Sequence, residues 1–269
     1  MLPNVKYIFE IFIGLGILAF TVYIWKAFNK EKFSTYVFNR MIIIIALSGI
    51  MMAIGANLAN RLFHFIGGTP WKETSGITFL AGFMIGMGCY IILFLILLKS
   101  ERKKILYYIN TFIPGVALGH GIGRIGCFLA GCCFGKVTNS ILGIAFPVNS
   151  PAYNYLINTL HLSSAEALMT KVYPTQLFEA IFCFILFIAL FLIKKHRTNI
   201  YLISYGTFRF LIEYLRNDNR GKLLFLPISP SQFLSIICIL IGVFLFILEL
   251  VIIPYYQKKK EISKKIKFF

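Results

Sequence analysis

Residues 77–98 read ITFLAGFMIGMGCYIILFLILL and contain no charged side chain. An α-helix rises about 1.5 Å per residue, so about 20 apolar residues cross the roughly 30 Å hydrocarbon core of a bilayer. The whole chain has the same character, because 58% of its 269 residues are hydrophobic and only 14% are charged. This composition, with a mean hydropathy of +0.80, excludes an ordinary soluble protein and indicates an integral membrane protein.

Other apolar runs of comparable length precede and follow this one, separated by short polar connections. The first is too long for a signal peptide, and no small-residue cleavage pattern follows it. We therefore predict a single all-α transmembrane domain over residues 1–269. Its seven membrane-spanning helices are expected at residues 5–28, 41–66, 77–98, 105–130, 175–193, 200–215 and 230–253. The fourth and sixth are the least apolar, because each contains arginine.

Lysine and arginine gather in alternate connections, which predicts the orientation of the chain. Basic residues are enriched in cytoplasmic loops, so we expect the amino terminus outside and a basic cytoplasmic tail at residues 254–269. The longest connection, residues 131–174, then forms an extracytoplasmic arm, either a substrate-docking lid or an ordinary loop. A positive inner face opposite anionic lipid accounts for the net charge of +17, so no nucleic-acid partner is expected.

A glycine-rich segment, GHGIGRIGCFLAGCCFG, occupies residues 119–135. Gly121, Gly123 and Gly126 formally match GxGxxG, but no strand precedes them and no βαβ unit surrounds them, which excludes a dinucleotide fold. Glycines at this density allow helices to approach closely in lipid. Packing does not explain Arg124, because a guanidinium inside a membrane span is costly unless it is paired or faces a wet cavity. Arg124 is therefore a candidate functional residue.

The sixth predicted span contains a second charged group within YGTFRFLIEYLRNDNRG, residues 205–221. Arg209, Glu213 and Arg216 lie at i, i+4 and i+7, which places them on one helical face. One interpretation is a ladder of ion pairs along this face, in which Glu213 is shared between the two arginines and neutralises their charge.

The charges inside the predicted bundle do not balance. Arg124, Arg209 and Arg216 outnumber Glu179 and Glu213, so we expect the surplus to be met by an anion. In a bilayer the natural anion is a lipid phosphate, which guanidinium groups bind through paired hydrogen bonds.

Two predicted helix starts supply further polar groups on the outer side. In YPTQLFEA, residues 173–180, Gln176 and Glu179 project on one side of the helix. In SPSQFLS, residues 229–235, the spacing of serine and Gln232 predicts a capping box, which is a structural role.

Four ordered blocks, GRIGCFLAGCCFG, YPTQLFEA, YGTFRFLIEYLRNDNRG and SPSQFLS, resemble the signature motifs of the prolipoprotein diacylglyceryl transferase family. The resemblance extends over residues 41–253. It implies seven helices and transfer of a diacylglyceryl group from a phosphatidylglycerol-like phospholipid to the cysteine thiol of an incoming prolipoprotein. The reaction forms a thioether and releases glycerol phosphate at the outer face of the bacterial inner membrane. It needs no cofactor, and the expected partners are this donor, this acceptor and membrane lipids.

The resemblance also implies roles for individual residues. Arg124 and Arg209 match the family's arginines and are expected to grip the phosphate and stabilise the leaving group. Glu213 is expected to orient Arg209 or Arg216. The substrate-binding pocket is expected to contain Gly123, Gly126, Gly131, Gly135, Gln176, Glu179, Glu213, Arg216 and Gln232.

One departure from the family pattern concerns the base that would take the thiol proton. Leu80 stands where the best-studied branch has a histidine. His120 lies four residues before Arg124 on the same helical face and is a candidate replacement. Two alternatives remain open: His120 is a hydrogen-bonded residue at a helix crossing, or the departing phosphate takes the proton.

Three cysteines in a C-x4-C-C pattern, Cys127, Cys132 and Cys133, are a further departure, and they place the chain in a divergent branch. The pattern lacks the two C-x2-C pairs typical of zinc sites, so no metal is expected. A disulfide on the oxidising outer side is an alternative, and small packing residues are the favoured interpretation.

Two alternative functions remain open. The chain could be a paralogue acting on another acceptor, or a noncatalytic lipid-binding or transport protein. Transporters usually contain an internal repeat, and this sequence shows none, which argues against transport.

Overall fold

The computed structural model describes residues 5–71, 77–217, 223 and 227–252 of the chain; the predicted basic tail, residues 254–269, lies outside them. The described part is helical, and β pairing within it is limited to isolated bridges, which confirms the all-α fold. Its long helices are α1 (Val5–Lys30), α2 (Thr35–Ile66), α3 (Phe79–Leu97), α4 (Ile105–Leu129), α7 (Thr175–Leu192), α8 (Arg197–Ile212) and α9 (Pro230–Ile247).

Six of these helices are long and apolar enough to cross a membrane, which confirms the multi-pass architecture. The exception is α8, which has 16 residues and carries Arg209 in its last turn. At about 1.5 Å per residue it is shorter than the hydrocarbon core, so the seventh span stays a prediction. The start of α2 also differs from the expectation, because Ser34 caps the helix and it begins at Thr35 rather than at residue 41, whereas its end at Ile66 is as predicted.

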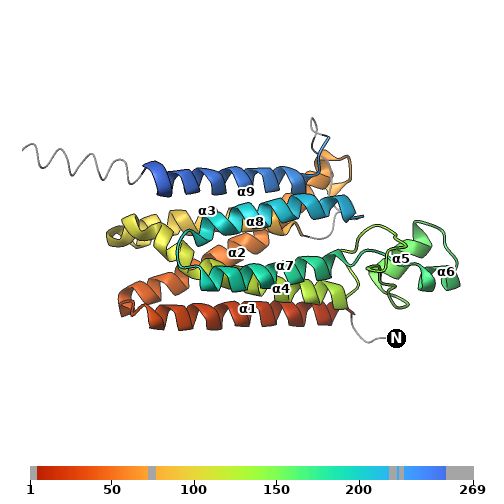
Figure 1. Cartoon of the computed structure of the whole chain (residues 1–269), viewed down its shortest axis with the longest axis horizontal. Helices are drawn as coiled ribbons and strands as arrows, with labels where there is room; N and C mark the ends of the chain where they lie inside the picture. Colours follow the sequence, from red (N-terminus) through yellow and green to blue (C-terminus); the bar gives the residue numbers. More distant parts are fainter. Residues whose placement is uncertain (1–4, 72–76, 218–222, 224–226, 253–269) are drawn as a thin grey trace, which may run out of the picture.

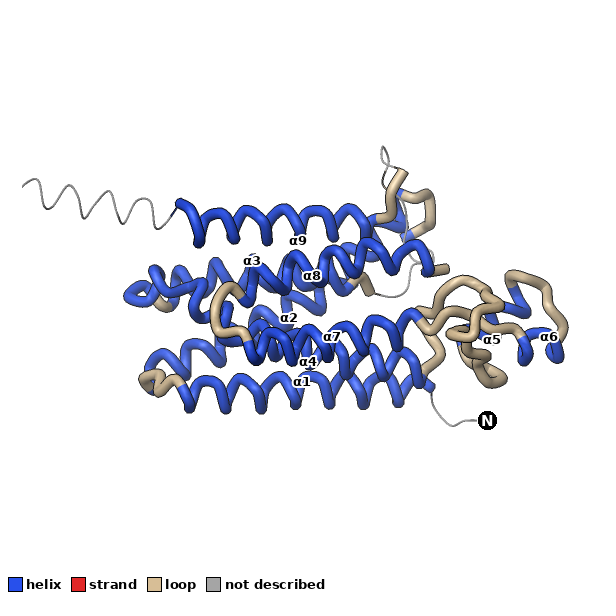
Figure 2. The backbone as a smooth tube through the Cα atoms, in the orientation of Figure 1, coloured by secondary structure: helices blue, strands red, loops and turns tan. Residues whose placement is uncertain are grey.

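The long helices run side by side in one bundle (Figures 1 and 2). Contacts along the bundle join α1 to α4, α2 to α3, α4 to α7 and α8 to α9. Where α1 crosses α4, a Cβ built on Gly119 would lie 2.9 Å from the carbonyl oxygen of Gly16. Such contact between backbones needs glycine on both helices, which explains part of the glycine content of α4.

The segment between α4 and α7, called the arm below, projects beyond one end of the bundle, and its extracytoplasmic position stays a prediction (Figure 1). It contains two short helices, α5 (Pro151–Asn158) and α6 (Ser164–Met169). Val172 pairs with Val137 and with Ile144, which folds the arm back on itself. The arm has its own small apolar core, formed by Phe146, Ala152, Tyr153, Leu156, Ala167 and Val172.

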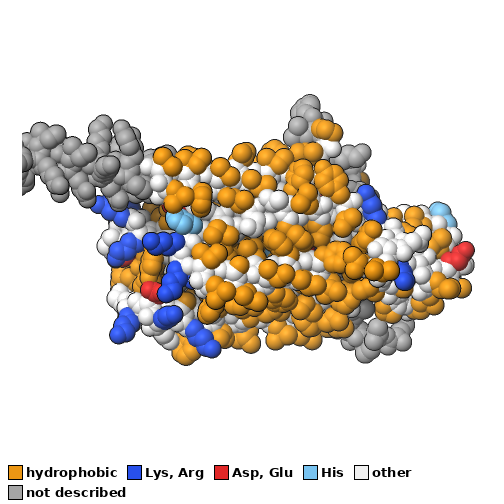
Figure 3. Space-filling view, in the orientation of Figure 1, with side chains coloured by type: hydrophobic (Ala, Val, Ile, Leu, Met, Phe, Trp, Pro, Cys, Tyr) orange, Lys and Arg blue, Asp and Glu red, His pale blue; other side chains and the backbone are white. Residues whose placement is uncertain are grey.

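The surface of the bundle divides into an apolar belt and a basic end. Figure 3 shows hydrophobic side chains over most of the bundle and lysine and arginine gathered at the end opposite the arm. Large apolar side chains on this surface are exposed, as Ile92 and Phe191 illustrate, which is the arrangement expected of a lipid-facing belt. The helix α1 begins at the arm end of the bundle (Figure 1).

Candidate active site

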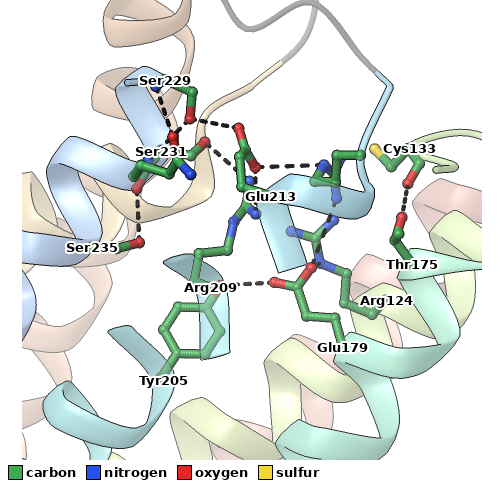
Figure 4. Close-up of polar contacts among 12 residues, drawn as sticks. Arg124, Cys133, Thr175, Glu179, Tyr205, Arg209, Glu213, Ser229, Ser231 and Ser235 are labelled. Carbon is green, nitrogen blue, oxygen red and sulfur yellow. Dashed lines mark hydrogen bonds and ion pairs between the residues drawn. The ribbon is translucent and has the colours of Figure 1, made fainter. Parts of the chain in front are cut away.

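The carboxylate of Glu179 on α7 lies at the centre of a buried polar cluster and is wholly inaccessible to solvent. Its Oε2 atom lies 3.0 Å from Arg124 Nε on α4 and 3.9 Å from a terminal nitrogen of Arg216. Its Oε1 atom accepts a 2.8 Å hydrogen bond from the Tyr205 hydroxyl (Figure 4). The same atom lies 3.5 Å from His120 Nε2. One carboxylate therefore connects three helices of the bundle.

A second carboxylate, that of Glu213, lies just beyond the end of α8. Its Oε2 atom is 2.6 Å from a terminal nitrogen of Arg209 and 4.0 Å from Arg216 Nε, and its Oε1 atom accepts a 2.8 Å hydrogen bond from Ser229. Arg209 also donates to the Ser231 hydroxyl at 3.0 Å (Figure 4). Arg216 lies between the two carboxylates, so both belong to one network.

The network contains three arginines and two carboxylates, as expected from the sequence. All three guanidinium-bearing residues are buried, and each lies within 4.0 Å of a carboxylate. Glu179 and Glu213 therefore pair with all three arginines, and the expected surplus of one positive charge remains, so an anion that meets this surplus stays a prediction. With His120 neutral, the network still has one positive charge in excess, and low polarity strengthens its attraction for an anion.

Comparison with known proteins identifies the chain that carries this network. The sequence profile of the prolipoprotein diacylglyceryl transferases matches residues 4–248. The chain belongs to this family. It is similar to the phosphatidylglycerol–prolipoprotein diacylglyceryl transferase of Clostridium tetani, with 34% identity over 87% of this chain and 89% of the relative.

Two further members of the prolipoprotein diacylglyceryl transferase family are similar over most of their length. Phosphatidylglycerol–prolipoprotein diacylglyceryl transferase 2 of Clostridium perfringens is 34% identical over 89% of this chain and 90% of the relative. The phosphatidylglycerol–prolipoprotein diacylglyceryl transferase of Dehalococcoides mccartyi strain 195 is 28% identical over 96% of this chain and 92% of the relative.

Only part of the segment that carries Arg209, Glu213 and Arg216 is α-helical. Arg209 and Glu213 form the expected i, i+4 pair. The α-helix ends at Ile212, however, and Arg216 has an extended backbone with φ −80° and ψ 154°. Helical spacing thus predicted the contact between Glu213 and Arg216 but not the route of the chain, which turns and brings Arg216 to Glu179 as well.

The two glutamines expected in the pocket have clear structural roles. Gln232 forms the predicted capping box with Ser229 at the start of α9. Gln176 donates a 2.6 Å hydrogen bond to the carbonyl oxygen of Cys132, and the Thr175 hydroxyl donates a 2.8 Å bond to that of Cys133. The start of α7 therefore holds the turn that follows α4. The Gln176 Oε1 atom is buried and has no hydrogen-bond partner in the described part of the chain.

The four glycines expected to bind substrate differ in their surroundings. A Cβ on Gly126 would lie 2.5 Å from Phe12 of α1, and one on Gly135 would lie 2.5 Å from the Leu215 carbonyl oxygen, so both permit close packing. Gly131 has φ +66°, a conformation that favours glycine. A Cβ on Gly123 would meet nothing within 4 Å, so of the four only Gly123 presents open backbone.

Leu80, at the position where the best-studied branch is expected to have a histidine, is buried in α3 as part of the apolar core. Its neighbour Phe79 stacks on His120, with 3.8 Å between ring centroids. Arg124 Nε lies 3.3 Å from His120 Nε2. Because an arginine N–H can only donate, Nε2 accepts and the ring proton lies on Nδ1, 3.6 Å from the Cys183 sulfur. His120 therefore holds Arg124 in place.

The sulfur atoms of Cys127, Cys132 and Cys133 all lie within 4.8 Å of one another, and all three residues are free cysteines. The predicted packing role does not by itself explain this convergence. Hydrogen bonding with the Cys127 and Cys133 thiols, followed by burial, raises the pKa of the Cys132 thiol well above its usual range.

Sequence reasoning missed two residues of the network, Tyr205 and Ser231. Tyr205 precedes Arg209 by four residues, so it lies on the same face of α8, and a polar hydroxyl in an apolar segment was a usable signal. Ser231 could not be found in this way, because its contact with Arg209 joins two helices.

Proposed function

We propose that the chain is a phosphatidylglycerol–prolipoprotein diacylglyceryl transferase of the bacterial inner membrane. The proposal rests mainly on the buried arginine network with one excess positive charge, in a chain that matches the family over residues 4–248. The names of the similar transferases supply the donor and acceptor classes. We further propose that Arg124 and Arg209 contact the phosphate, and that the remaining residues of the network orient them.

We propose an orientation with the arm and the arginine network toward the outer face. The basic residues at the opposite end of the bundle would then face the cytoplasm, in agreement with the positive-inside rule (Figure 3). The amino terminus would lie outside, because α1 begins at the arm end (Figure 1). The acceptor thiol would reach the site from the side of the arm.

The proposed reaction is a substitution at the glycerol carbon that bears the phosphate. The acceptor sulfur forms a bond to this carbon, the carbon–oxygen bond to the phosphate breaks, and glycerol phosphate leaves with the electron pair. Negative charge grows on the leaving oxygen, and buried guanidinium groups stabilise this charge more than they stabilise the ground state. The excess positive charge of the network suits this task.

We propose that His120 takes the thiol proton. Its Nε2 lone pair accepts from Arg124 in the structure, so it becomes available when Arg124 turns to the phosphate. This order couples donor binding to the generation of the base.

His120→Gln tests this role, because glutamine can still accept from Arg124 but cannot take a proton. We expect turnover to fall about 100-fold or more, as for removal of a general base. We also expect loss of the acid limb of the pH profile, where protonation inactivates the histidine. His161→Gln, on the exposed arm, is the control. Identical pH profiles for the wild type and His120→Gln would assign the thiol proton to the departing phosphate.

The proposed activity is tested in a bacterium depleted of its own transferase. Expression of the chain should restore growth, and mass spectrometry of a reporter lipoprotein should show a diacylglyceryl group on its amino-terminal cysteine sulfur. Purified protein should also release glycerol phosphate from phosphatidylglycerol when a lipoprotein peptide is present. Release without peptide modification would point to another acceptor. If neither glycerol phosphate release nor peptide modification is seen, the proposal is contradicted and a noncatalytic lipid-binding protein is supported.

A further inference from the structure

The three thiols at the end of α4 form a cluster that the proposed reaction does not use. Cys127 lies in the last turn of α4, and Cys132 and Cys133 lie in the turn that follows. All three sulfurs are within 4.8 Å of one another, although the C-x4-C-C spacing did not predict this. A metal bound by thiolates at about 2.3 Å places its sulfurs roughly 3.8 to 4.0 Å apart, so a contraction of less than about 1 Å would complete a site.

The backbone around these cysteines is held in an unusual conformation. Cys133 has φ +61°, in the left-handed region that non-glycine residues rarely adopt, and Gly131 has φ +66°. For a cysteine such a conformation is strained and persists where the surroundings enforce it. Here the Cys132 and Cys133 carbonyls accept from Gln176 and Thr175. Two hydrogen bonds from α7 therefore fix the turn that directs the sulfurs toward Cys127.

Charge also favours a bound metal. Cys127 follows Arg124 by three residues on the same face of α4, next to the network with one positive charge in excess. Three thiolates with a divalent cation carry a net charge of −1, which balances this excess. A disulfide would use two of the three sulfurs and leave the third without a role, and small packing residues would not need the strained turn.

We propose that Cys127, Cys132 and Cys133 bind a thiophilic d10 cation, such as Zn²⁺, through three thiolates. Binding converts three thiols into three metal–sulfur bonds and releases three protons, without any oxidation or reduction. Cys132 and Cys133 are partly exposed, so the ion can enter from the arm end of the bundle. The proposal concerns metal binding alone and holds whether or not the chain transfers a diacylglyceryl group.

Titration of the purified full-length protein with Cd²⁺ tests this proposal, because cadmium–thiolate bonds give an ultraviolet charge-transfer band. We expect one Cd²⁺ per chain, competition by Zn²⁺ and protection of three thiols from alkylation. We expect each single variant, Cys127→Ser, Cys132→Ser or Cys133→Ser, to weaken Cd²⁺ binding strongly. The loss should exceed the roughly 10–100-fold typical of removing a residue that contacts only the metal ligands. Cys89→Ser, a matched change on α3, should bind as the wild type does.

Three results would overturn the metal site. The first is absence of the band in the wild type, and the second is an undiminished band in the triple serine variant. The third is a disulfide among these cysteines in peptides from native membranes prepared without reductant. Each readout is independent of transferase activity, so failure here leaves the proposed function intact, and failure of the proposed function leaves the metal site intact.

Discussion

Arg124→Lys is expected to lower diacylglyceryl transfer by about 100-fold or more while the protein still inserts into the membrane. Lysine keeps the positive charge beside Glu179, so the buried carboxylate retains a partner. It lacks the planar set of N–H donors that grips a phosphate oxygen in the transition state, and loss of one such donor typically costs 10²–10³ in rate, an order-of-magnitude figure. Transfer from phosphatidylglycerol to a lipoprotein peptide would be measured at equal protein content.

The controls for this variant separate chemistry from folding. Arg102→Lys makes the same change on an exposed residue at the opposite end of the bundle and should leave transfer unchanged. Arg124→Ala is expected to lose activity and also stability, because it leaves Glu179 with one fewer cationic partner. Transfer at the wild-type rate by correctly inserted Arg124→Lys would remove Arg124 from the proposed mechanism.

Glu179→Gln is expected to have the largest effect on stability. The change keeps the size of the side chain but removes the negative charge that faces Arg124 and Arg216, and the network then carries two excess positive charges. Breaking a buried ion pair on one side typically costs about 3–5 kcal/mol. The midpoint of thermal unfolding in detergent should therefore fall clearly below that of the wild type.

A double variant shows whether the charge imbalance causes this loss. Glu179→Gln combined with Arg124→Gln restores the original net charge, so it should be more stable than the sum of the two single changes predicts. Glu166→Gln on the exposed arm is the matched control, since glutamine can also complete the capping box with Ser163. If Glu179→Gln unfolds at the same midpoint temperature as the wild type, the ion pairs of Glu179 contribute little to the stability of the fold.

The fold could be predicted to a large extent because membrane spans depend on local composition. The apolar runs at residues 105–130 and 175–193 match α4 and α7 to within one residue at each end. The sixth span was predicted less well, since the helix stops at Ile212 and a tight turn follows. Apolarity alone does not show where a helix ends when its last residues bind partners on another helix.

The polar residues of the site were predicted better than their partners. An arginine in a membrane span is conspicuous, so Arg124 and Arg209 could be selected from composition alone. The sequence could not show that Glu179 contacts four other residues of the network, because these lie on different helices. The grouping of the three thiols likewise depends on a left-handed turn that no motif encodes.

The base of the arm lies between the two segments that carry the carboxylates. The Gly135 amide donates to the Tyr173 carbonyl, just before α7, and the Lys136 amide donates to the Leu215 carbonyl, just before Arg216. A load on the arm therefore pulls on both sides of the network at once. Under the proposed orientation, we expect an incoming polypeptide that displaces this segment to change the separation of Glu179 and Glu213, and with it the position of Arg216 between them.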